Sequence, residues 1–206
     1  VKLTDYVLTT TFSTSDDCEI YFTNYASNPI VQEDNSLVVI DYGDGTYGTK
    51  LNHTYSKTGD YKVKFYFSKP ITAIADITFN ATSIKQISIP ASVVSIGKLA
   101  FHLSLLEIIS FESESNLALI GDSAFSDSSL KEIRLPSSLE SVGYGIFSGC
   151  EQLKSITVAQ GGYYSHWLVD GCGWLMSLDS NEWSIIAYPA GAPTEDVQSV
   201  GGDMTI

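Results

Sequence analysis

The side chains that could carry out chemistry in this chain are few and lie far apart. Histidine can act as a general base and cysteine as a nucleophile, and the chain has three of each. Cys172 and His166 are close in sequence, but no third residue beside them would orient the histidine. The chain has no nucleophile elbow, phosphate-binding loop or His-Glu-x-x-His zinc sequence. We therefore expect a protein that is not an enzyme and that binds no cofactor.

The most concentrated group of unusual residues is aromatic. All three tryptophans, Trp167, Trp174 and Trp183, fall within 17 residues of each other, and Tyr164 lies beside them. Exposed rings would stack on sugars or form the centre of a protein-binding surface, whereas buried rings would form the core of a local hairpin. The sequence leaves both alternatives open.

The composition indicates an ordered protein that is rich in strands. The chain has 206 residues, of which 44% are hydrophobic and only 17% are charged. Tyr, Phe, Ile, Val and Thr are plentiful, and these residue types favour strands. A net charge of −13 argues against a nucleic-acid partner, because phosphate binding needs a positive face. No stretch reaches the ~20 apolar residues of a transmembrane helix.

Residues 1–68 have the pattern of short strands joined by tight turns. The segment 61–67 alternates strictly between two faces, with Lys62, Lys64 and Tyr66 on the more polar one, which is typical of a half-buried strand. The segment 36–42 is almost continuously apolar, as expected of a central strand. These patterns predict a β-sandwich over 1–68.

Two segments of this region carry a family resemblance. One contains Tyr42-Gly43-Asp44-Gly45, and the other contains His53-Thr54-Tyr55 followed by Gly59-x-Tyr61-x-Val63. Together they resemble the polycystic-kidney-disease (PKD) type of immunoglobulin-like domain, which implies a structural hydrogen bond for His53. Tyr61 is expected to hydrogen-bond back across its turn. Asp41 and Asp44 could bind calcium, or could bond the backbone of their own turn.

A repeat of 22 to 24 residues occupies about 71–158, and it predicts a solenoid. Four phenylalanines, Phe79, Phe101, Phe125 and Phe147, are separated by 22, 24 and 22 residues and should stack inside it. Each repeat would add one short strand to a parallel sheet and then return along the opposite side. The second repeat is two residues longer, and we expect a bulge near 112–116.

These repeats resemble the BspA-like bacterial leucine-rich repeats. The segment from Ser129 to Cys150 comes nearest to that consensus, and 169–191 resembles the hairpin insertion of the same family. The expected fold class is therefore mainly β, with a PKD-type immunoglobulin-like β-sandwich at 1–68 followed by a short leucine-rich-repeat solenoid at 69–206. The solenoid is expected to have parallel strands, short helical turns and an inserted hairpin at about 163–190.

The resemblance implies a bacterial protein that is exported to the cell surface or secreted, with a removed leader before Val1. It also implies adhesion to host matrix or cell-surface proteins through the solenoid. The candidate contacts are polar residues that point outward from the strands, together with the aromatic group: Lys85, Glu107, Lys131, Arg134, Lys154, Tyr164, Trp167, Trp174 and Trp183. The polar ones would equally suit an ordinary solvated surface. The alternative function is a carbohydrate-binding accessory module that uses the tryptophans, and a purely structural spacer is a third.

Overall fold

The computed structural model describes residues 6–15, 18–23 and 37–159 with their side chains, and the backbone of 167–169, 175–179 and 182–187. The N-terminal strands are β1 (Tyr6–Thr14), β2 (Cys18–Tyr21), β3 (Leu37–Asp41), β4 (Tyr47–Gly48), β5 (Asn52–Tyr55) and β6 (Gly59–Phe67). The repeats contribute β7 (Ala73–Ile74), β8 (Ile84–Ile89), β9 (Ser95–Ile96), β10 (Ile108–Phe111), β11 (Leu119–Ile120), β12 (Glu132–Leu135), β13 (Ser141–Val142) and β14 (Ser155–Val158). The last strands are β15 (Trp167–Val169), β16 (Leu175–Asp179) and β17 (Glu182–Ala187), which form an antiparallel sheet.

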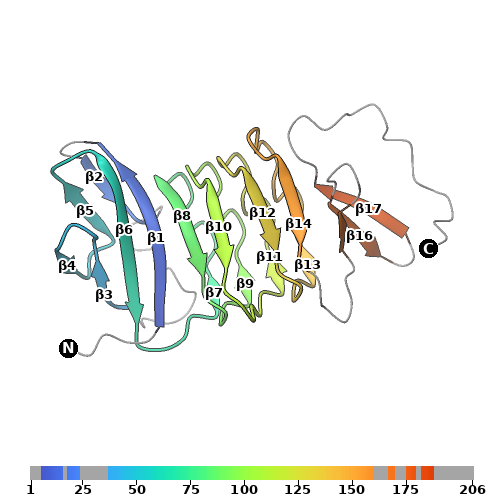
Figure 1. Ribbon diagram of the computed structural model, residues 1–206, viewed down its shortest axis with the longest axis horizontal. Coiled ribbons are helices and arrows are strands. Elements are labelled where there is room, and N and C mark those ends of the chain that lie inside the picture. The colour runs from blue at the N-terminus through green and yellow to red at the C-terminus, as the bar shows by residue number, and fades with distance from the viewer. Residues whose placement is uncertain are drawn as a thin grey trace.

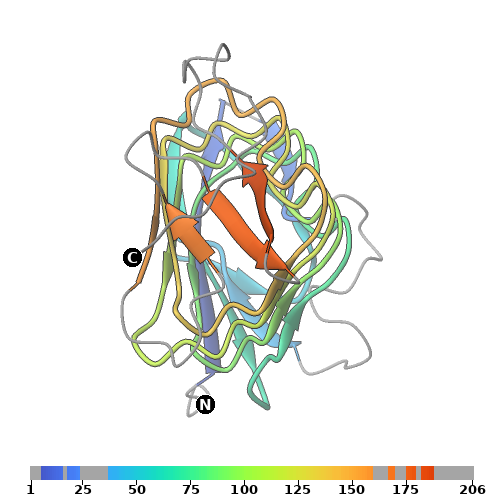
Figure 2. The same ribbon diagram turned by 90° about the vertical axis from the view of Figure 1, so that its right-hand side faces the viewer.

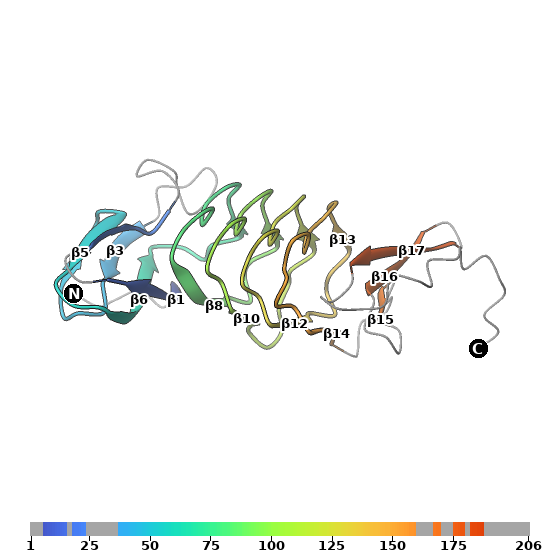
Figure 3. The same ribbon diagram turned by 90° about the horizontal axis from the view of Figure 1, so that it is seen from above.

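The repeats form a β-solenoid of about four coils that stack side by side (Figures 1 and 3). Each coil places one longer strand, β8, β10, β12 or β14, on one side of the stack. Each also places a two-residue strand on the opposite side, where β7, β9, β11 and β13 pair in parallel as one four-stranded sheet. Seen end on, the coils superimpose around a common interior (Figure 2).

The interior of the coils contains the predicted column of phenylalanines. Phe79, Phe101, Phe125 and Phe147 stack in order, with ring centroids 5.3, 5.4 and 5.7 Å apart and interplanar angles of 14°, 8° and 22°. All four rings are buried. The structure confirms this prediction, because a side chain at one repeat position meets its equivalent on the next coil.

The segments that lead from the short strands back to the long strands, which we term the return segments, differ from the prediction. They contain turns, and the described residues include none of the short helical turns expected from the sequence. The second coil shows the reason, because Leu99 and Leu103 both have a left-handed backbone, each with φ of 55°. A left-handed residue every four positions stops a right-handed helix from continuing.

The N-terminal region packs its strands around an aromatic core. Strands β1, β6, β3 and β4 are neighbours in one sheet, and β2 pairs separately with β5. Phe22, just after β2, lies 5.0 Å from the Phe12 ring of β1 and 5.9 Å from the Phe65 ring of β6, centroid to centroid. The expected Tyr61 hydrogen bond is present, since its hydroxyl donates to the Lys57 carbonyl over 3.1 Å.

Strand β1 connects the N-terminal region to the coils. It pairs antiparallel with β6 along one edge and with β8 along the other. The result is a six-stranded sheet in the order β10-β8-β1-β6-β3-β4, which runs across the predicted boundary at residue 68. The backbone groups at the open edge of β8 are thereby paired, and this caps the first coil.

The parallel ladder is interrupted at the next step, because β10 and β12 belong to different sheets. The extra two residues of the β10 coil lie at the corner 112–116, where Glu114 is left-handed with φ of 62°. In the neighbouring coils, the residue that follows the long strand donates its backbone N–H to a carbonyl of the preceding coil. The Glu112 N–H donates to the Ile89 carbonyl over 3.0 Å, and the Ala159 N–H donates to the Leu135 carbonyl over 2.8 Å. The equivalent residue on the β12 coil is Pro136, which has no N–H to donate.

Candidate interaction surface

The six-stranded sheet and the neighbouring two-stranded sheet of β12 and β14 each have a side whose side chains point away from the core, and together these sides run from the N-terminal region along the coils. We term this surface the outer face, and it comprises the outward side chains of β3, β6, β1, β8, β10, β12 and β14 with the residues that precede the last four strands. Strand register aligns its residues in rows, such as Lys62 opposite Thr11 and Thr11 opposite Gln86. A second row runs Lys64, Thr9, Ser88 and Ser110.

Four predicted site residues form a single row at the starts of the long strands. The backbone N–H of Glu107 donates to Lys85, that of Lys131 to Glu107 and that of Lys154 to Lys131, over 2.8, 3.4 and 2.9 Å. The Lys131 ammonium forms an ion pair with the Glu107 carboxylate. The structure therefore brings these four residues together, one on each successive coil.

The row continues onto the N-terminal region through Asp60 of β6. The Lys85 ammonium lies 3.3 Å from the Asp60 carboxylate, and the Ser13 hydroxyl of β1 donates to the same carboxylate over 2.6 Å. The hydrogen bond from Ser13, and then Lys85, lower the pKa of Asp60 from its ordinary value. The carboxylate is therefore ionised at neutral pH and connects the two regions at the surface.

Positive charge is concentrated on the outer face. It carries six of the 11 Lys and Arg residues of the chain, namely Lys62, Lys64, Lys85, Lys131, Arg134 and Lys154. Among the described residues it carries only four of the 24 Asp and Glu residues, namely Asp41, Asp60, Glu107 and Glu132. The face is therefore slightly cationic on a chain whose net charge is −13.

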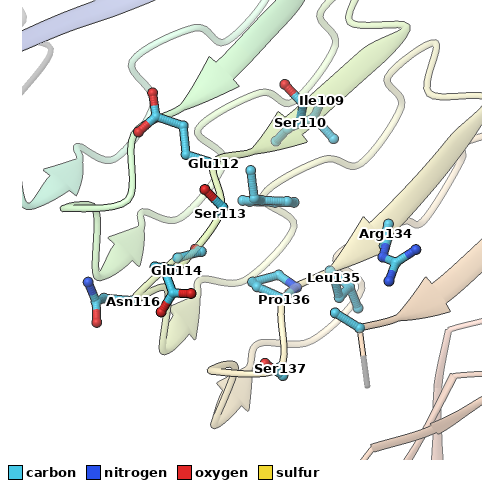
Figure 4. A pocket seen from close by; sticks show the side chains of 13 residues that line it. Ile109, Ser110, Glu112, Ser113, Glu114, Asn116, Arg134, Leu135, Pro136 and Ser137 are labelled. Carbon is cyan, nitrogen blue, oxygen red and sulfur yellow. The ribbon is translucent and has the colours of Figure 1, made fainter. Parts of the chain in front are cut away.

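A polar hollow of about 660 Å³ opens where the ladder is interrupted (Figure 4). It lies between Ser110 and Phe111 of β10 on one side and Arg134 of β12 on the other, with the corner 112–116 along its rim. Glu112 on this rim accepts a hydrogen bond from the Ala91 N–H over 3.0 Å. The hollow adjoins the outer face, because Ser110 and Arg134 belong to both.

The aromatic part of the predicted site is outside the residues whose side chains are described. Trp167 pairs with Ser177 across β15 and β16, and Trp183 pairs with Leu178 across β16 and β17. Tyr164 and Trp174 lie outside the described residues altogether. Both alternatives for these rings, exposed on the surface or buried in a hairpin core, therefore stay open.

The described histidines and cysteines have structural partners. His53 Nε2 lies 2.7 Å from the Asp44 carboxylate, and its ring stacks on Tyr42 with centroids 4.1 Å apart. Burial raises the pKa of Cys150, whose thiol donates to the Phe125 carbonyl over 2.9 Å. A protonated, hydrogen-bonded thiol is a poor nucleophile.

The acidic turn residues bond to their own backbone. The Asp41 carboxylate accepts from the Gly43 N–H, and the Asp44 carboxylate accepts from the Thr46 N–H and hydroxyl. No cluster of three metal-binding side chains occurs among the described residues. The described part of the chain likewise includes no helix long and apolar enough to cross a bilayer.

Sequence reasoning did not include Lys62 and Lys64 in the binding surface. The alternation of 61–67 had placed both lysines on the polar face of a strand, but it could not show that this strand lies two positions from β8 in the same sheet. The sequence also did not predict the hollow, although the longer second repeat indicated an irregularity at 112–116, which is the corner that borders it.

These features define a parallel-stranded repeat solenoid with an extended, polar surface and no assembled catalytic group in the described residues. Residues 54–165 match the BspA type leucine rich repeat region in six copies, which is more than half of the chain. The protein belongs to this family of leucine-rich repeat proteins, a family not known as enzymes.

Among solved structures, the chain is 31% identical to the pneumococcal vaccine antigen PcpA, with a TM-score of 0.52 over 58% of this chain. The match spans only 29% of the PcpA chain. A leucine-rich repeat protein from Bacteroides capillosus is 30% identical, with a TM-score of 0.39 over 50% of this chain and 67% of that one. One from Eubacterium ventriosum is 21% identical, with a TM-score of 0.45 over 61% and 38%. No curated protein matches the chain.

Proposed function

We propose that this protein is a non-enzymatic adhesion protein that binds a partner protein through its outer face. The observation that carries the proposal is the row Lys85, Glu107, Lys131 and Lys154, which sets one charged residue on each coil at a fixed spacing. Such a row offers a long, rigid contact surface, as solenoids use for binding. Membership of a leucine-rich repeat family supports a protein as the partner.

The wider assignment includes export to the cell surface or secretion, with host matrix proteins as candidate partners. It is supported by the family match and by the likeness to a protein described as a vaccine antigen. The N-terminal region is assigned as a PKD-type immunoglobulin-like unit at 1–68, ahead of the solenoid at 69–206. The stacked Tyr42 and His53 rings and the Tyr61 hydrogen bond are consistent with that motif.

A steric test separates the outer face from the opposite side of the coils. Ser110 is exposed on β10 of the outer face, and Ser141 is exposed on β13 of the opposite sheet. The full chain and two variants, Ser110→Tyr and Ser141→Tyr, would be tested against immobilised matrix proteins such as fibrinogen, fibronectin and laminin. We expect Ser110→Tyr to weaken the binding by about tenfold or more, the equivalent of ~1.4 kcal/mol.

The Ser141→Tyr variant should bind like the unmodified chain, because its new ring lies on the other side of the coils. Equal losses in both variants would contradict binding through the outer face. A carbohydrate partner remains the alternative, and it depends on the tryptophans at 167–183, whose side chains are not described.

A further inference from the structure

The N-terminal region and the coils share the outer face without a gap. Strand β1 presents Thr9, Thr11 and Ser13 on this face, and its pairing with β6 and β8 sets lysines on both sides of these hydroxyls. Asp60 of β6 and Lys85 of the first coil form an ion pair over the junction. The N-terminal region therefore extends the same surface rather than standing apart from it.

Internal pairing neutralises the middle of this surface. Two of its cations, Lys85 and Lys131, have carboxylate partners in Asp60 and Glu107. The other four, Lys62, Lys64, Arg134 and Lys154, form no ion pair with another described residue.

The four cations that have no ion-pair partner among the described residues fall into two groups, one in the N-terminal region and one on the coils. Lys62 and Lys64 lie on β6, while Arg134 and Lys154 lie on or just before β12 and β14. Four strand positions separate β6 from β12 along the face, or about 19 Å at ~4.8 Å per strand. Between the groups lie hydroxyl side chains, including Thr9, Thr11, Ser88 and Ser110.

The rest of the molecule favours one orientation for an acidic partner. The chain has 24 acidic and only 11 basic residues, and six of the basic ones are on the outer face. A negatively charged surface would be repelled by most of the protein and attracted to this face, since long-range fields steer encounter complexes. Rim charges of this kind set the orientation and the rate of association.

We propose that the outer face is one composite docking surface and that its partner is a protein with an acidic surface. Lys62 and Lys64 of the N-terminal region hold one end of the partner, and Arg134 and Lys154 of the coils hold the other. This inference rests on the proposed function and adds to it the partner's chemistry and a binding role for the N-terminal region.

The test uses the full chain and poly(L-glutamate) as a defined acidic probe, with poly(L-lysine) and heparin as alternatives. Affinity would be measured at about 20 and 200 mM salt, where screening differs strongly. Three double variants would be compared, namely Lys62→Gln/Lys64→Gln, Arg134→Gln/Lys154→Gln and the control Lys57→Gln/Lys98→Gln. The control removes the same charge from exposed residues that lie outside the strands of the outer face, with one change in each region.

We expect each outer-face pair to lose about threefold or more in affinity for poly(L-glutamate) at low salt, and the control pair to lose less than twofold. The loss should shrink at high salt because the contacts are exposed. Carbodiimide coupling of bound poly(L-glutamate) should modify Lys62, Lys64 and Lys154 in preference to Lys57 and Lys98. Thermal unfolding of each variant would show that the fold is retained.

An effect of Arg134 and Lys154 without an effect of Lys62 and Lys64 would overturn the composite surface while leaving the proposed function in place. Equal losses in all three double variants, or no binding of poly(L-glutamate), would overturn the acidic partner. Stronger binding of heparin would replace the protein partner with an anionic polysaccharide. Loss of matrix binding in Ser141→Tyr as well as Ser110→Tyr would count against the proposed function separately.

Discussion

On the side of the return segments, β7, β9, β11 and β13 form an uninterrupted parallel sheet, whereas the ladder on the opposite side stops between β10 and β12. The interior next to the return segments is equally regular, with four stacked phenylalanines. The outer face combines charges held in ion pairs, charges that have no ion-pair partner among the described residues, and a hollow. The side of the return segments thus maintains the coil geometry, and the side chains of the outer face are free to vary without loss of the fold.

The largest expected effect is on the regular side. Phe125→Ala would leave a cavity in the middle of the column and should lower the free energy of unfolding by about 3–5 kcal/mol. Phe111→Ala on the β10 strand should cost less than half as much, because Phe111 is only partly buried and already lines the hollow. Chemical denaturation of both variants would measure the difference. A loss below ~1 kcal/mol for Phe125→Ala would mean that the column does not hold the coils together.

A smaller effect is expected where successive coils approach most closely. A Cβ at Gly143 would lie 2.6 Å from the Asp122 Cα of the preceding coil, too close for the backbone to accommodate without a shift. We expect Gly143→Ala to cost about 1–3 kcal/mol of unfolding free energy. Ser110→Ala on the exposed outer face should stay within about 0.5 kcal/mol. Similar costs for the two changes would show that coil spacing is no tighter on the return side.

Much of this regular side could be predicted from the sequence, because its core residues recur every 22 to 24 positions. The spacing of Phe79, Phe101, Phe125 and Phe147 was enough to predict the column. The prediction of short helical turns was wrong. Leu99 and Leu103 are not residue types that favour a left-handed backbone, and the stacking of the coils imposes this conformation on them.

The candidate surface could be predicted only in part. The row from Lys85 to Lys154 follows from the repeat, since equivalent residues stack. Its extension onto Lys62 and Lys64 depends on the pairing of β1 with β8, and that long-range contact has no signal in either segment. The hollow likewise depends on two coils together, because it needs both the longer corner at 112–116 and Pro136 on the next coil.

On the outer face, the ion pair between Lys131 and Glu107 should contribute little to stability. Both side chains are partly exposed, and exposed pairs typically contribute about 0–1 kcal/mol. Lys131→Met, Glu107→Gln and the double variant would give the coupling energy in a double-mutant cycle. A coupling well above ~1 kcal/mol would indicate that the outer face also maintains the coil geometry.

The smallest effect concerns pH at the junction of the two regions. The pKa of Asp60 is lowered in the folded protein by the Ser13 hydroxyl and by Lys85. A lowered folded pKa gives stability that is present above the unfolded pKa and is lost as the pH falls through the folded pKa. Asp60→Asn should therefore lose slightly more stability at pH 7 than at pH 3, as measured by urea unfolding. An equal loss at both values would show that the carboxylate charge has no part in the junction.

The stacking of equivalent strands makes the outer face adjustable in length by whole units. Duplication of one coil would move Arg134 and Lys154 about one strand spacing, ~4.8 Å, farther from Lys62 and Lys64 without altering any contact inside a coil. Deletion of a coil would bring them closer by the same step. Genes that gain or lose such repeats by recombination could thus match the surface to partners of different size, while the phenylalanine column simply grows or shortens by one ring.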